Sequence, residues 1–355
     1  MAAAATVVAT DFSELEAALD SRWPAGQPGG AIIIARGDSV IYERYEGIAD
    51  LGTGEEISPA TRFNIASVSK QFTVMALLQQ ARLYGGGLPL LDTPMDSFVT
   101  YSRPWWHDIT PAMLASHTSG LDDRRTGTRE WKINATDDDA IAYFADLEAP
   151  AHAPGCYYDY LNPSFVLLAR LVEQLSGREF TGYVTENLLA PAGMADTYYF
   201  DRAAAPRDQA HAYIPAGDGA WREYDFGEET FFATRPDGGL YSTARDMIAW
   251  LGALRDGRVL PPSWVELSRR PRVSVSDSPY CQYQRRPDTW YALGQFVEQP
   301  EGRPRKIFHT GDNGGFQAYV AVYPDSDTRI VILENRNDRS RSQLVGLVDK
   351  ALGYR

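Results

Sequence analysis

The chain has 355 residues, of which 44% are hydrophobic, and a formal net charge of −13 at pH 7. Such a chain can bury a large core, as one big domain or as two closely packed lobes. The negative charge argues against nucleic acid or an anionic membrane as a partner, because clustered lysine and arginine bind both. We expect no membrane anchor either, since no run reaches the roughly 18 apolar residues of a spanning helix.

The first ten residues are apolar but lack the basic segment and the longer hydrophobic run of an intact signal peptide. This favours a cytoplasmic protein, with export and a signal peptide absent from this sequence as the alternative. Cys156 and Cys281 match neither a disulfide framework nor the spacing of a zinc site. The oligomeric state stays open.

The first part of the chain reads as a helix, a hairpin and a second helix. Residues 11–23 have apolar side chains at helical spacing, which predicts an amphipathic surface helix. Residues 31–35 and 39–45 are strand-like, and the turn-forming residues 36–38 join them into a hairpin. Residues 67–83 are apolar on most of a helical circumference, which predicts a helix inside the core.

From residue 85 to about residue 242, short helical patterns alternate with connections rich in glycine, proline and aspartate. Strand patterns then return, at residues 291–297, 307–308, 317–323 and 329–333. Residues 339–352 close the chain as an amphipathic helix. We therefore expect an α+β fold, in which both chain ends build one antiparallel sheet flanked by helices.

Two lobes follow from this order of elements. Residues 11–85 and 245–355 would form an α/β lobe, and residues 86–244 would form an inserted, mainly helical lobe. The active site would lie between them.

Ser67-Val68-Ser69-Lys70 is an S-x-x-K sequence. Three residues make about one helical turn, so the hydroxyl of Ser67 and the amine of Lys70 would face the same side. At the start of a helix, the dipole favours negative charge on the serine oxygen, and burial favours a neutral lysine that can accept its proton. The sequence has only three other lysines, namely Lys132, Lys306 and Lys350.

Tyr160-Leu161-Asn162 and His309-Thr310-Gly311 follow Ser67 and Lys70 in the chain. Together the three sequences resemble the S-x-x-K, Y-x-N and K/H-T-G triplet of serine β-lactamases and penicillin-binding proteins. This group includes class C β-lactamases, D,D-carboxypeptidases, D-aminopeptidases, carboxylesterases and acyltransferases. The resemblance covers roughly residues 29–352 and implies the β-lactamase/transpeptidase-like fold.

The resemblance also implies a role for each matched residue. Ser67 would attack a carbonyl carbon, with Lys70 and Tyr160 sharing the proton transfers. Asn162 would orient Lys70 and hold a substrate amide. His309, Thr310 and Gly311 would lie on a strand beside the cleft and bind substrate, and the backbone N–H groups of Ser67 and Asp312 would stabilise the oxyanion. Taken without the triplet, Tyr160 would more often be a core aromatic and Asn162 a helix cap.

Two positions depart from the pattern. His309 stands where β-lactamases usually have lysine, which resembles certain D,D-carboxypeptidases and esterases and weakens the case for an efficient β-lactamase. Asp312 stands where many relatives have a small neutral residue. A carboxylate near the oxyanion hole would repel a substrate carboxylate, so we expect a preference for neutral or amine-bearing substrates over free C-terminal acids.

Other chemistry finds less support. His117 lies in Ser116-His117-Thr118-Ser119-Gly120, where a structural turn is expected, with an imidazole that satisfies backbone groups and serines that act as turn and cap residues. The sequence has no G-x-S-x-G, no H-x-x-x-H and no glycine-rich nucleotide-binding sequence. We expect no cofactor and no metal.

The sequence thus predicts a serine hydrolase that cleaves an ester or amide of a small-molecule or peptide substrate through an acyl-Ser67 intermediate. Esterase, D,D-peptidase and β-lactamase activities all remain open. One alternative is an acyltransferase that delivers the same acyl group to an alcohol or amine. Another is a non-catalytic binding protein that has kept the fold.

Overall fold

The computed structural model describes residues 10–84, 89–99, 103–122, 136–200, 208–224, 235–279, 288–338 and 340–354. Cys281 and Lys132 lie outside these residues. The largest element is an eight-stranded antiparallel sheet with the order β10-β11-β12-β13-β14-β15-β1-β2. Its strands are β1 (Gly30–Arg36), β2 (Ser39–Glu46), β10 (Val273–Ser274), β11 (Thr289–Tyr291), β12 (Phe296–Glu298), β13 (Lys306–Asn313), β14 (Phe316–Tyr323) and β15 (Thr328–Glu334).

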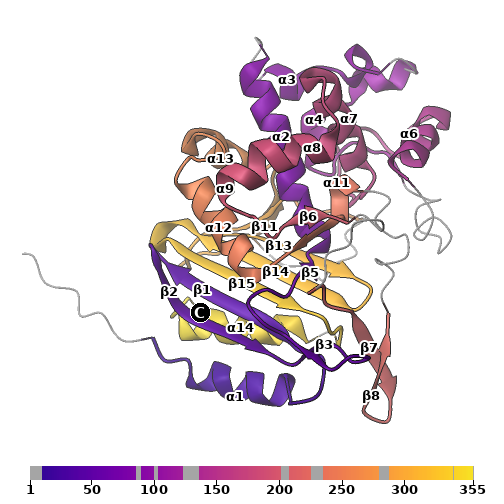
Figure 1. Ribbon diagram of the computed structural model, residues 1–355. Helices are drawn as coiled ribbons and strands as arrows, with labels where there is room; N and C mark the ends of the chain where they lie inside the picture. Colours follow the sequence, from indigo (N-terminus) through magenta and orange to yellow (C-terminus); the bar gives the residue numbers. More distant parts are fainter. Residues whose placement is uncertain are drawn as a thin grey trace, which may run out of the picture.

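Both ends of the chain share this sheet. Strand β1 pairs with β2 on one side and with β15 on the other, and Ile32 lies opposite Ile332. In Figure 1 the indigo strands of the N-terminal hairpin accordingly lie beside the yellow strands of the C-terminal part. The expected α+β fold with an antiparallel sheet from both chain ends is confirmed.

The central strands are apolar on both faces, so helices must cover both. Alternate residues of a strand point to opposite faces. Ile33 and Val331 pack into the core on one face, whereas Ile32 and Ile332 pack into a second core on the other. Strand β15 is buried along its whole length, which explains why its sequence is a nearly continuous apolar run.

Helices α1 (Ser13–Arg22) and α14 (Arg341–Ala351) cover one face. Leu15 and Leu19 of α1 join Leu344 and Val348 of α14 in the core beneath this face. The predicted helices at both chain ends are therefore confirmed, although α1 buries one side completely. Their packing holds the two ends of the chain together.

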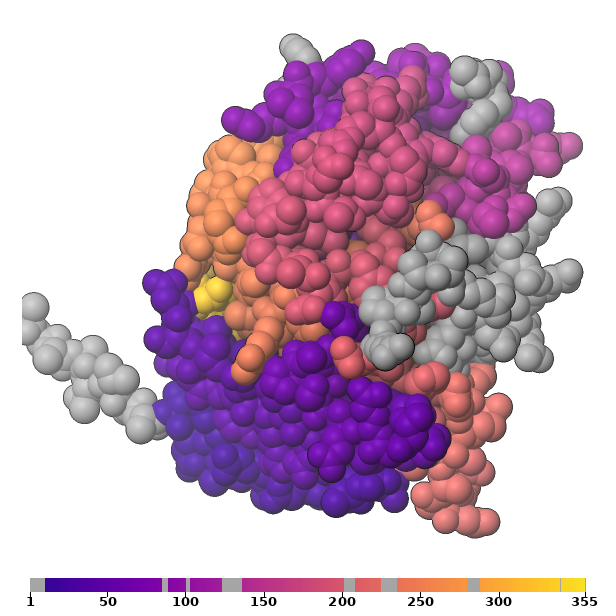
Figure 2. Space-filling model, viewed as in Figure 1, coloured from indigo at the N-terminus to yellow at the C-terminus, as the bar shows by residue number. Residues whose placement is uncertain are grey.

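The remaining helices lie on the other face of the sheet or beyond it (Figure 1). Figure 2 shows the magenta and pink atoms of the middle of the chain gathered above the indigo atoms of the first strands. The helices and helical turns are α2 (Lys70–Leu83), α3 (Pro89–Asp92), η2 (Met95–Ser97), η3 (Pro104–Asp108), α4 (Pro111–Ala115), α6 (Asp137–Asp146), α7 (Ser164–Ser176), α8 (Phe180–Val184), η4 (Thr185–Leu189), α9 (Ala190–Ala192), α11 (Arg235–Gly238), α12 (Ala244–Arg255) and α13 (Pro262–Ser268), with η1 (Ala66–Ser69) before α2 and η6 (Pro324–Ser326) after β14.

Helix α2 is the central helix that the sequence predicts. Of its 14 residues, 11 are buried, including Phe72, Leu77 and Leu78. The exact limits of the two expected lobes stay a prediction. Within the described residues, no helix is both long and apolar enough to cross a lipid bilayer.

The prediction of one strand at residues 291–297 is wrong, because this range contains the end of β11 and the start of β12. The backbone N–H of Ala292 donates to the carbonyl of Gln295 over 2.9 Å, and Gly294 has a φ of +68°. The chain therefore turns back between β11 and β12, and the glycine in the run was the available signal. The strand predicted at residues 307–308 is instead eight residues long and carries the His309-Thr310-Gly311 sequence.

Short sheets also occur, partly where mainly helical structure was expected. Strands β7 (Tyr213–Gly217) and β8 (Ala220–Glu223) form a hairpin, and β5 (Phe63–Asn64), β9 (Leu240–Ser242) and β6 (Tyr198–Tyr199) form a three-stranded sheet. Strands β3 (Ile48–Asp50) and β4 (Glu55–Glu56) pair separately. Strands β6, β7, β8 and β9 of these sheets lie in residues 86–244, the expected helical lobe. Most of these strands are too short to give a clear alternation in the sequence.

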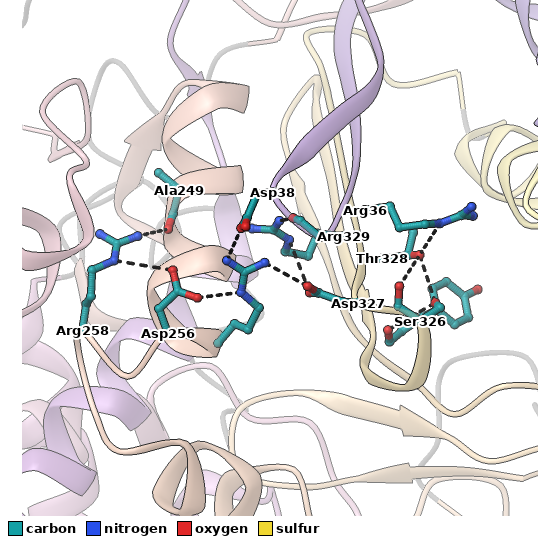
Figure 3. Close-up of polar contacts among 12 residues, drawn as sticks. Arg36, Asp38, Ala249, Asp256, Arg258, Ser326, Asp327, Thr328 and Arg329 are labelled. Atoms are coloured by element: carbon teal, nitrogen blue, oxygen red, sulfur yellow. Dashed lines mark hydrogen bonds and ion pairs between the residues drawn. The ribbon is translucent and has the colours of Figure 1, made fainter.

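An ion-pair network ties the end of α12 to two turns of the sheet (Figure 3). Arg255 pairs with Asp38 of the β1–β2 turn, with Asp256, and with Asp327 before β15. Arg329 donates to the carbonyl of Gly37 in the same β1–β2 turn. These contacts fix the position of α12 over the sheet.

A second ionic contact is buried between α1 and β15. Glu334 is completely buried, and the guanidinium of Arg22 donates to its two oxygens over 2.5 and 2.8 Å. Trp23 donates its indole N–H to the same carboxylate over 2.8 Å. Because burial removes the hydration of both charges, either partner left alone would be costly.

We expect Glu334→Gln to lower the free energy of unfolding by about 3–5 kcal/mol, since it leaves the Arg22 guanidinium without its main counter-charge in the interior. Chemical denaturation measures this change. Asp138→Asn is the matched control, because it removes a carboxylate that is 83% exposed and pairs with Arg170 at the surface; it should cost less than about 1 kcal/mol. Equal effects in the two variants would contradict the structural role of Glu334.

Candidate active site

Ser67 lies in a tight helical turn, η1, immediately before α2. It is partly exposed, whereas its neighbours Ala66, Val68 and Ser69 are buried. Ala66 has a φ of +46°, which is unusual for a residue other than glycine. The side chain of Asn64 stabilises this turn by accepting the backbone N–H of Ala66 over 2.9 Å. The chain therefore presents the hydroxyl of Ser67 to solvent on a fixed turn.

Lys70 is fully buried, and its amine reaches three oxygens. Its Nζ lies 3.0 Å from Ser67 Oγ, 2.7 Å from Asn162 Oδ1 and 2.8 Å from the backbone oxygen of Asp237. The oxygens of Asn162 and Asp237 can only accept hydrogen bonds. Two N–H groups of Lys70 are thus committed, and the third position on the nitrogen faces the serine hydroxyl.

This third position can hold either a proton or a lone pair. Burial lowers the pKa of Lys70 to about 8, and the nearby negative charge of Asp237 opposes this effect. A substantial fraction of Lys70 is then neutral near pH 8, with its lone pair available to the Ser67 hydroxyl. The predicted S-x-x-K neighbours are in hydrogen-bond contact.

Tyr160 and Asn162 come from the segment before α7. The ring centroid of Tyr160 lies 5.0 Å from Lys70 Nζ. Asn162 is exposed although its oxygen binds Lys70. The structure thus brings the first two elements of the predicted triplet to one place, with Ser67, Lys70, Tyr160 and Asn162 around a single amine.

His117 positions this segment. Its Nδ1 accepts the backbone N–H of Leu161 over 3.0 Å, and its carbonyl accepts the N–H of Asp159 over 2.8 Å. The His117 ring also lies against Tyr160, with centroids 4.2 Å apart. Burial and the charge of Lys70 lower the pKa of His117 well below its ordinary value, so the ring is a neutral acceptor. The expectation that His117 satisfies backbone groups in a turn is confirmed.

The neighbouring serines also have the expected structural contacts. Ser116 Oγ donates to the carbonyl of Ala112 over 2.8 Å, at the end of α4. Ser119 Oγ accepts the N–H of Leu121 over 3.4 Å. Both serines are buried, which fits their interpretation as turn residues.

Strand β13 supplies the third element of the triplet. Strand β12 pairs with β13 only from Lys306 to Phe308, and beyond this point η1 lies beside β13. A Cβ atom on Gly311 would lie 2.2 Å from the carbonyl oxygen of Ile65. Glycine is therefore required there, because it lets the strand approach the turn that carries Ser67.

His309 is also buried, and both of its ring nitrogens have partners. Nδ1 lies 2.6 Å from the carbonyl oxygen of Thr310, and Nε2 lies 2.9 Å from the hydroxyl of Tyr291. Burial and the positive charge of Lys70 lower the pKa of His309 to about 3. The imidazole that replaces the usual lysine is thus uncharged.

The expectation that the Asp312 carboxylate lies near the oxyanion hole and repels a substrate carboxylate is wrong. Arg341 of α14 binds its carboxylate through two nitrogens, over 3.0 and 2.8 Å, and Gln317 donates to it over 3.1 Å. Alternation along β13 directs Asp312 to the α14 face, opposite to the face of His309. Its charge is paired away from Ser67, so it gives no basis for repelling a substrate carboxylate. The oxyanion role of its backbone N–H stays a prediction.

Comparison with known proteins identifies the family. A sequence model described as Beta-lactamase matches residues 15–352. The chain belongs to the Beta-lactamase family. The resemblance seen in the triplet is thereby confirmed.

Among curated relatives, the D-aminopeptidase of Brucella ovis is 30% identical over an alignment of 242 residues, which covers 63% of this chain and 42% of the relative. The D-aminopeptidase of Brucella anthropi is 30% identical over an alignment of 252 residues, which covers 64% of this chain and 43% of the relative. The chain thus spans less than half the length of the curated relatives it matches.

Solved structures show the same fold. A penicillin-binding protein from Bacillus halodurans superposes with a TM-score of 0.78 at 24% identity, covering 95% of this chain and 99% of its own. The D-amino acid amidase from Ochrobactrum anthropi SV3, complexed with D-phenylalanine, superposes with a TM-score of 0.75 at 22% identity, covering 96% and 99%.

Three residues of the site escaped the sequence analysis. Asn64 holds the turn before Ser67, and Asn313 of β13 donates to Asn64 Oδ1 over 3.0 Å. Asp237 supplies the backbone oxygen for Lys70. Asn64 lies shortly before the S-x-x-K sequence and Asn313 shortly after the His309-Thr310-Gly311 sequence, so a polar residue close to a recognised sequence was the available signal. Nothing local marks Asp237, because its backbone makes the contact.

The site contains no evident metal centre. Among the described residues, no group of three or more histidine, cysteine, aspartate or glutamate side chains is placed to hold a metal ion.

We expect His117→Ala to lower kcat/KM by roughly ten- to a hundredfold, because Tyr160 and Asn162 lose the acceptor that positions Leu161 between them. It should also lower the free energy of unfolding by about 1–3 kcal/mol, since the N–H of Leu161 is left buried and unpaired. Steady-state kinetics and denaturation measure both. His117→Asn is the control, because asparagine tolerates the φ of +58° at this position and keeps an acceptor. Unchanged kcat/KM in His117→Ala would show that the hydrogen bond from Leu161 to His117 does not contribute to activity.

Gly311→Ala should disable the site by a different route. Its Cβ would overlap the carbonyl of Ile65, so β13 and the Ser67 turn must move apart. We expect labelling of Ser67 by an active-site acylating probe to slow by about tenfold or more. Gly302→Ala is the control, because no atom lies within 4 Å of the added carbon, although its φ of +71° carries a small backbone strain of its own. Equal labelling rates in the two variants would contradict the close approach.

Proposed function

We propose that this protein is a serine hydrolase that cleaves an amide or ester bond through an acyl-Ser67 intermediate. The observation that carries the proposal is the amine of Lys70, which is held by two carbonyl oxygens and faces the Ser67 hydroxyl. A buried lysine of lowered pKa beside a partly exposed serine is the arrangement that makes a weak hydroxyl nucleophilic.

The reaction would proceed in two halves. Ser67 Oγ attacks the carbonyl carbon while its proton passes to the neutral amine of Lys70. The carbon–nitrogen or carbon–oxygen bond of the tetrahedral species then breaks, and the leaving group takes up a proton delivered by Lys70 through Tyr160. Water attacks the acyl ester, its proton returns by the same groups, and the acid product leaves Ser67 free.

The other predicted residues would bind and polarise the substrate. The backbone N–H groups of Ser67 and Asp312 would stabilise the oxyanion. The amide nitrogen of Asn162 would hold a substrate carbonyl, and the part of β13 that begins at His309, with Thr310 and Gly311, would bind an extended substrate along its edge. These roles rest on the family resemblance and on the positions of the residues beside one another.

For the substrate class we propose amides and short peptides whose acyl part is a D-amino acid. The support comes from the relatives, since the curated matches are D-aminopeptidases and one of the similar structures is a D-amino acid amidase. Esters with the same acyl group would react by the same steps and with a better leaving group.

The first test is covalent. After incubation with a fluorophosphonate, intact mass spectrometry should show one adduct on the wild-type protein and none on Ser67→Ala. Turnover is then measured with D-alaninamide, L-alaninamide and a p-nitrophenyl ester, each with and without an added acceptor alcohol. The rates should rank the amidase, esterase and acyl-transfer activities. An adduct that persists in Ser67→Ala, or the absence of any adduct, would overturn the proposal.

The pH dependence provides a separate test. Lys70 must be neutral to accept the proton, so kcat/KM should rise with pH and level off above the lowered pKa of about 8. Asp137 needs a control, because burial and the charge of Asp237 raise its pKa to about 7. Asp137→Asn should leave the rise near pH 8 in place, whereas Lys70→Ala should lower kcat/KM by about 10²–10⁴-fold. The range from pH 6 to 9 contains the pKa of Lys70, about 8, and that of Asp137, about 7. If kcat/KM stays constant over this range, Lys70 is excluded as the base.

A further inference from the structure

The two hydrogen bonds of His309 fix its protonation. The carbonyl oxygen of Thr310 can only accept, so Nδ1 of His309 must carry the proton of that 2.6 Å contact. In a neutral imidazole the other nitrogen has a lone pair, so Nε2 accepts the hydroxyl proton of Tyr291 over 2.9 Å. Neither nitrogen is left to a substrate.

The surroundings oppose a positive charge on this ring. His309 is 1% exposed, and its ring lies 5.2 Å from that of Phe296 and 6.4 Å from that of Tyr160, between centroids. The charged groups that act on it, Lys70 and Arg341, are both positive.

The anionic and titratable neighbours do not change this balance. His117 is buried and its pKa is also lowered. On the same strand, Asp312 is bound by Arg341, and on the flanking strand β12, Glu298 is bound by Lys306. Among the described residues, the imidazole is hydrogen-bonded to Thr310 and Tyr291 and to no anion.

We propose that Tyr291 is a positioning residue of the site, which holds His309 as a fixed, uncharged side chain beside Tyr160. Tyr291 is itself buried, and its ring meets that of Phe296 edge to face at 4.7 Å. Its hydroxyl therefore approaches His309 from a rigid support. With Nε2 occupied, His309 serves neither as a base nor as an anchor for a negative group.

A consequence for specificity follows, and it rests on the proposed hydrolase function. A cation at position 309 would attract a carboxylate on the leaving group, whereas a neutral imidazole does not. A carboxylate that approaches this buried imidazole would lose hydration without gaining a counter-charge there, so the site should favour leaving groups without a free carboxylate. The preference first expected from Asp312 thus acquires a different physical basis, the neutrality of His309.

The tautomer can be measured without any turnover. The chain has five histidines, so ¹⁵N-histidine labelling and long-range ¹H–¹⁵N correlation give a simple spectrum, with His309→Gln to assign the signals. We expect Nδ1–H, a hydrogen-bonded Nε2 and no titration of His309 between pH 5 and pH 9, because its pKa is lowered to about 3. Observation of Nε2–H, or of a charged ring at pH 7, would overturn the proposal.

Tyr291→Phe tests the role of the hydroxyl, because phenylalanine keeps the ring packing. Its Nε2 resonance should shift to that of an unbonded nitrogen, and the pKa of His309 should rise. Tyr323→Phe is the matched control, since it removes another buried hydroxyl, bonded to Asp349 over 2.5 Å on the α14 side of the sheet. If the Nε2 resonance is the same in Tyr291→Phe and the wild type, Tyr291 does not hold the ring.

The specificity is tested with two substrates that differ only at the leaving end, D-alanyl-D-alanine and D-alanyl-D-alaninamide. We expect the wild type to prefer the amide in kcat/KM by about tenfold or more, and His309→Lys to reduce this ratio by a similar factor. The proposed specificity would be overturned if the kcat/KM ratio of amide to acid is unchanged in His309→Lys, or if the wild type prefers the acid. If neither substrate is cleaved, the hydrolase proposal fails for this class, while the NMR experiment still decides the role of Tyr291.

Discussion

The candidate site depends on one constraint, the burial of a lysine amine among oxygens that cannot donate to it. Asn162 Oδ1 and the backbone oxygen of Asp237 each take one N–H of Lys70, which leaves Ser67 Oγ as the third partner. A lysine in solution has no such preference and stays charged. Here the protein fixes the direction of the amine and lowers the cost of its neutral form, so the position of the proposed base is determined before a substrate arrives.

Two supports from distant parts of the chain maintain this geometry. His117 holds the backbone between Tyr160 and Asn162, while Asn64 and Asn313 join the serine turn to β13. Gly311 permits that junction because any side chain there would collide with Ile65. His117, Asn64 and Asn313 can support the site in this way without touching a substrate. The precision of the site therefore resides in backbone groups and amides around the reactive residues.

Much of this could be predicted from the sequence, for identifiable reasons. A spacing of three residues on a helix brings Ser67 to Lys70, and strand-like runs at both chain ends predict one shared sheet. The turn at Gly294 was missed because β11 and β12 are three residues each, too short for an alternation to stand out. Asp312 was misjudged because its partner, Arg341, lies on a helix that sequence distance does not connect to it.

The shared sheet also sets the order in which the protein can become complete. Strand β1 finds its partner β15 close to the end of the chain, and β13, which borders the serine turn, is made nearly as late. When the first half of the protein has left the ribosome, α2 and Ser67 are present without β13, the strand that lies beside the serine turn. Contacts of such sequence separation form slowly and leave apolar strands uncovered in the meantime. Strand β1 therefore lacks its partner β15, and the Ser67 turn lacks β13, until these later strands have been made.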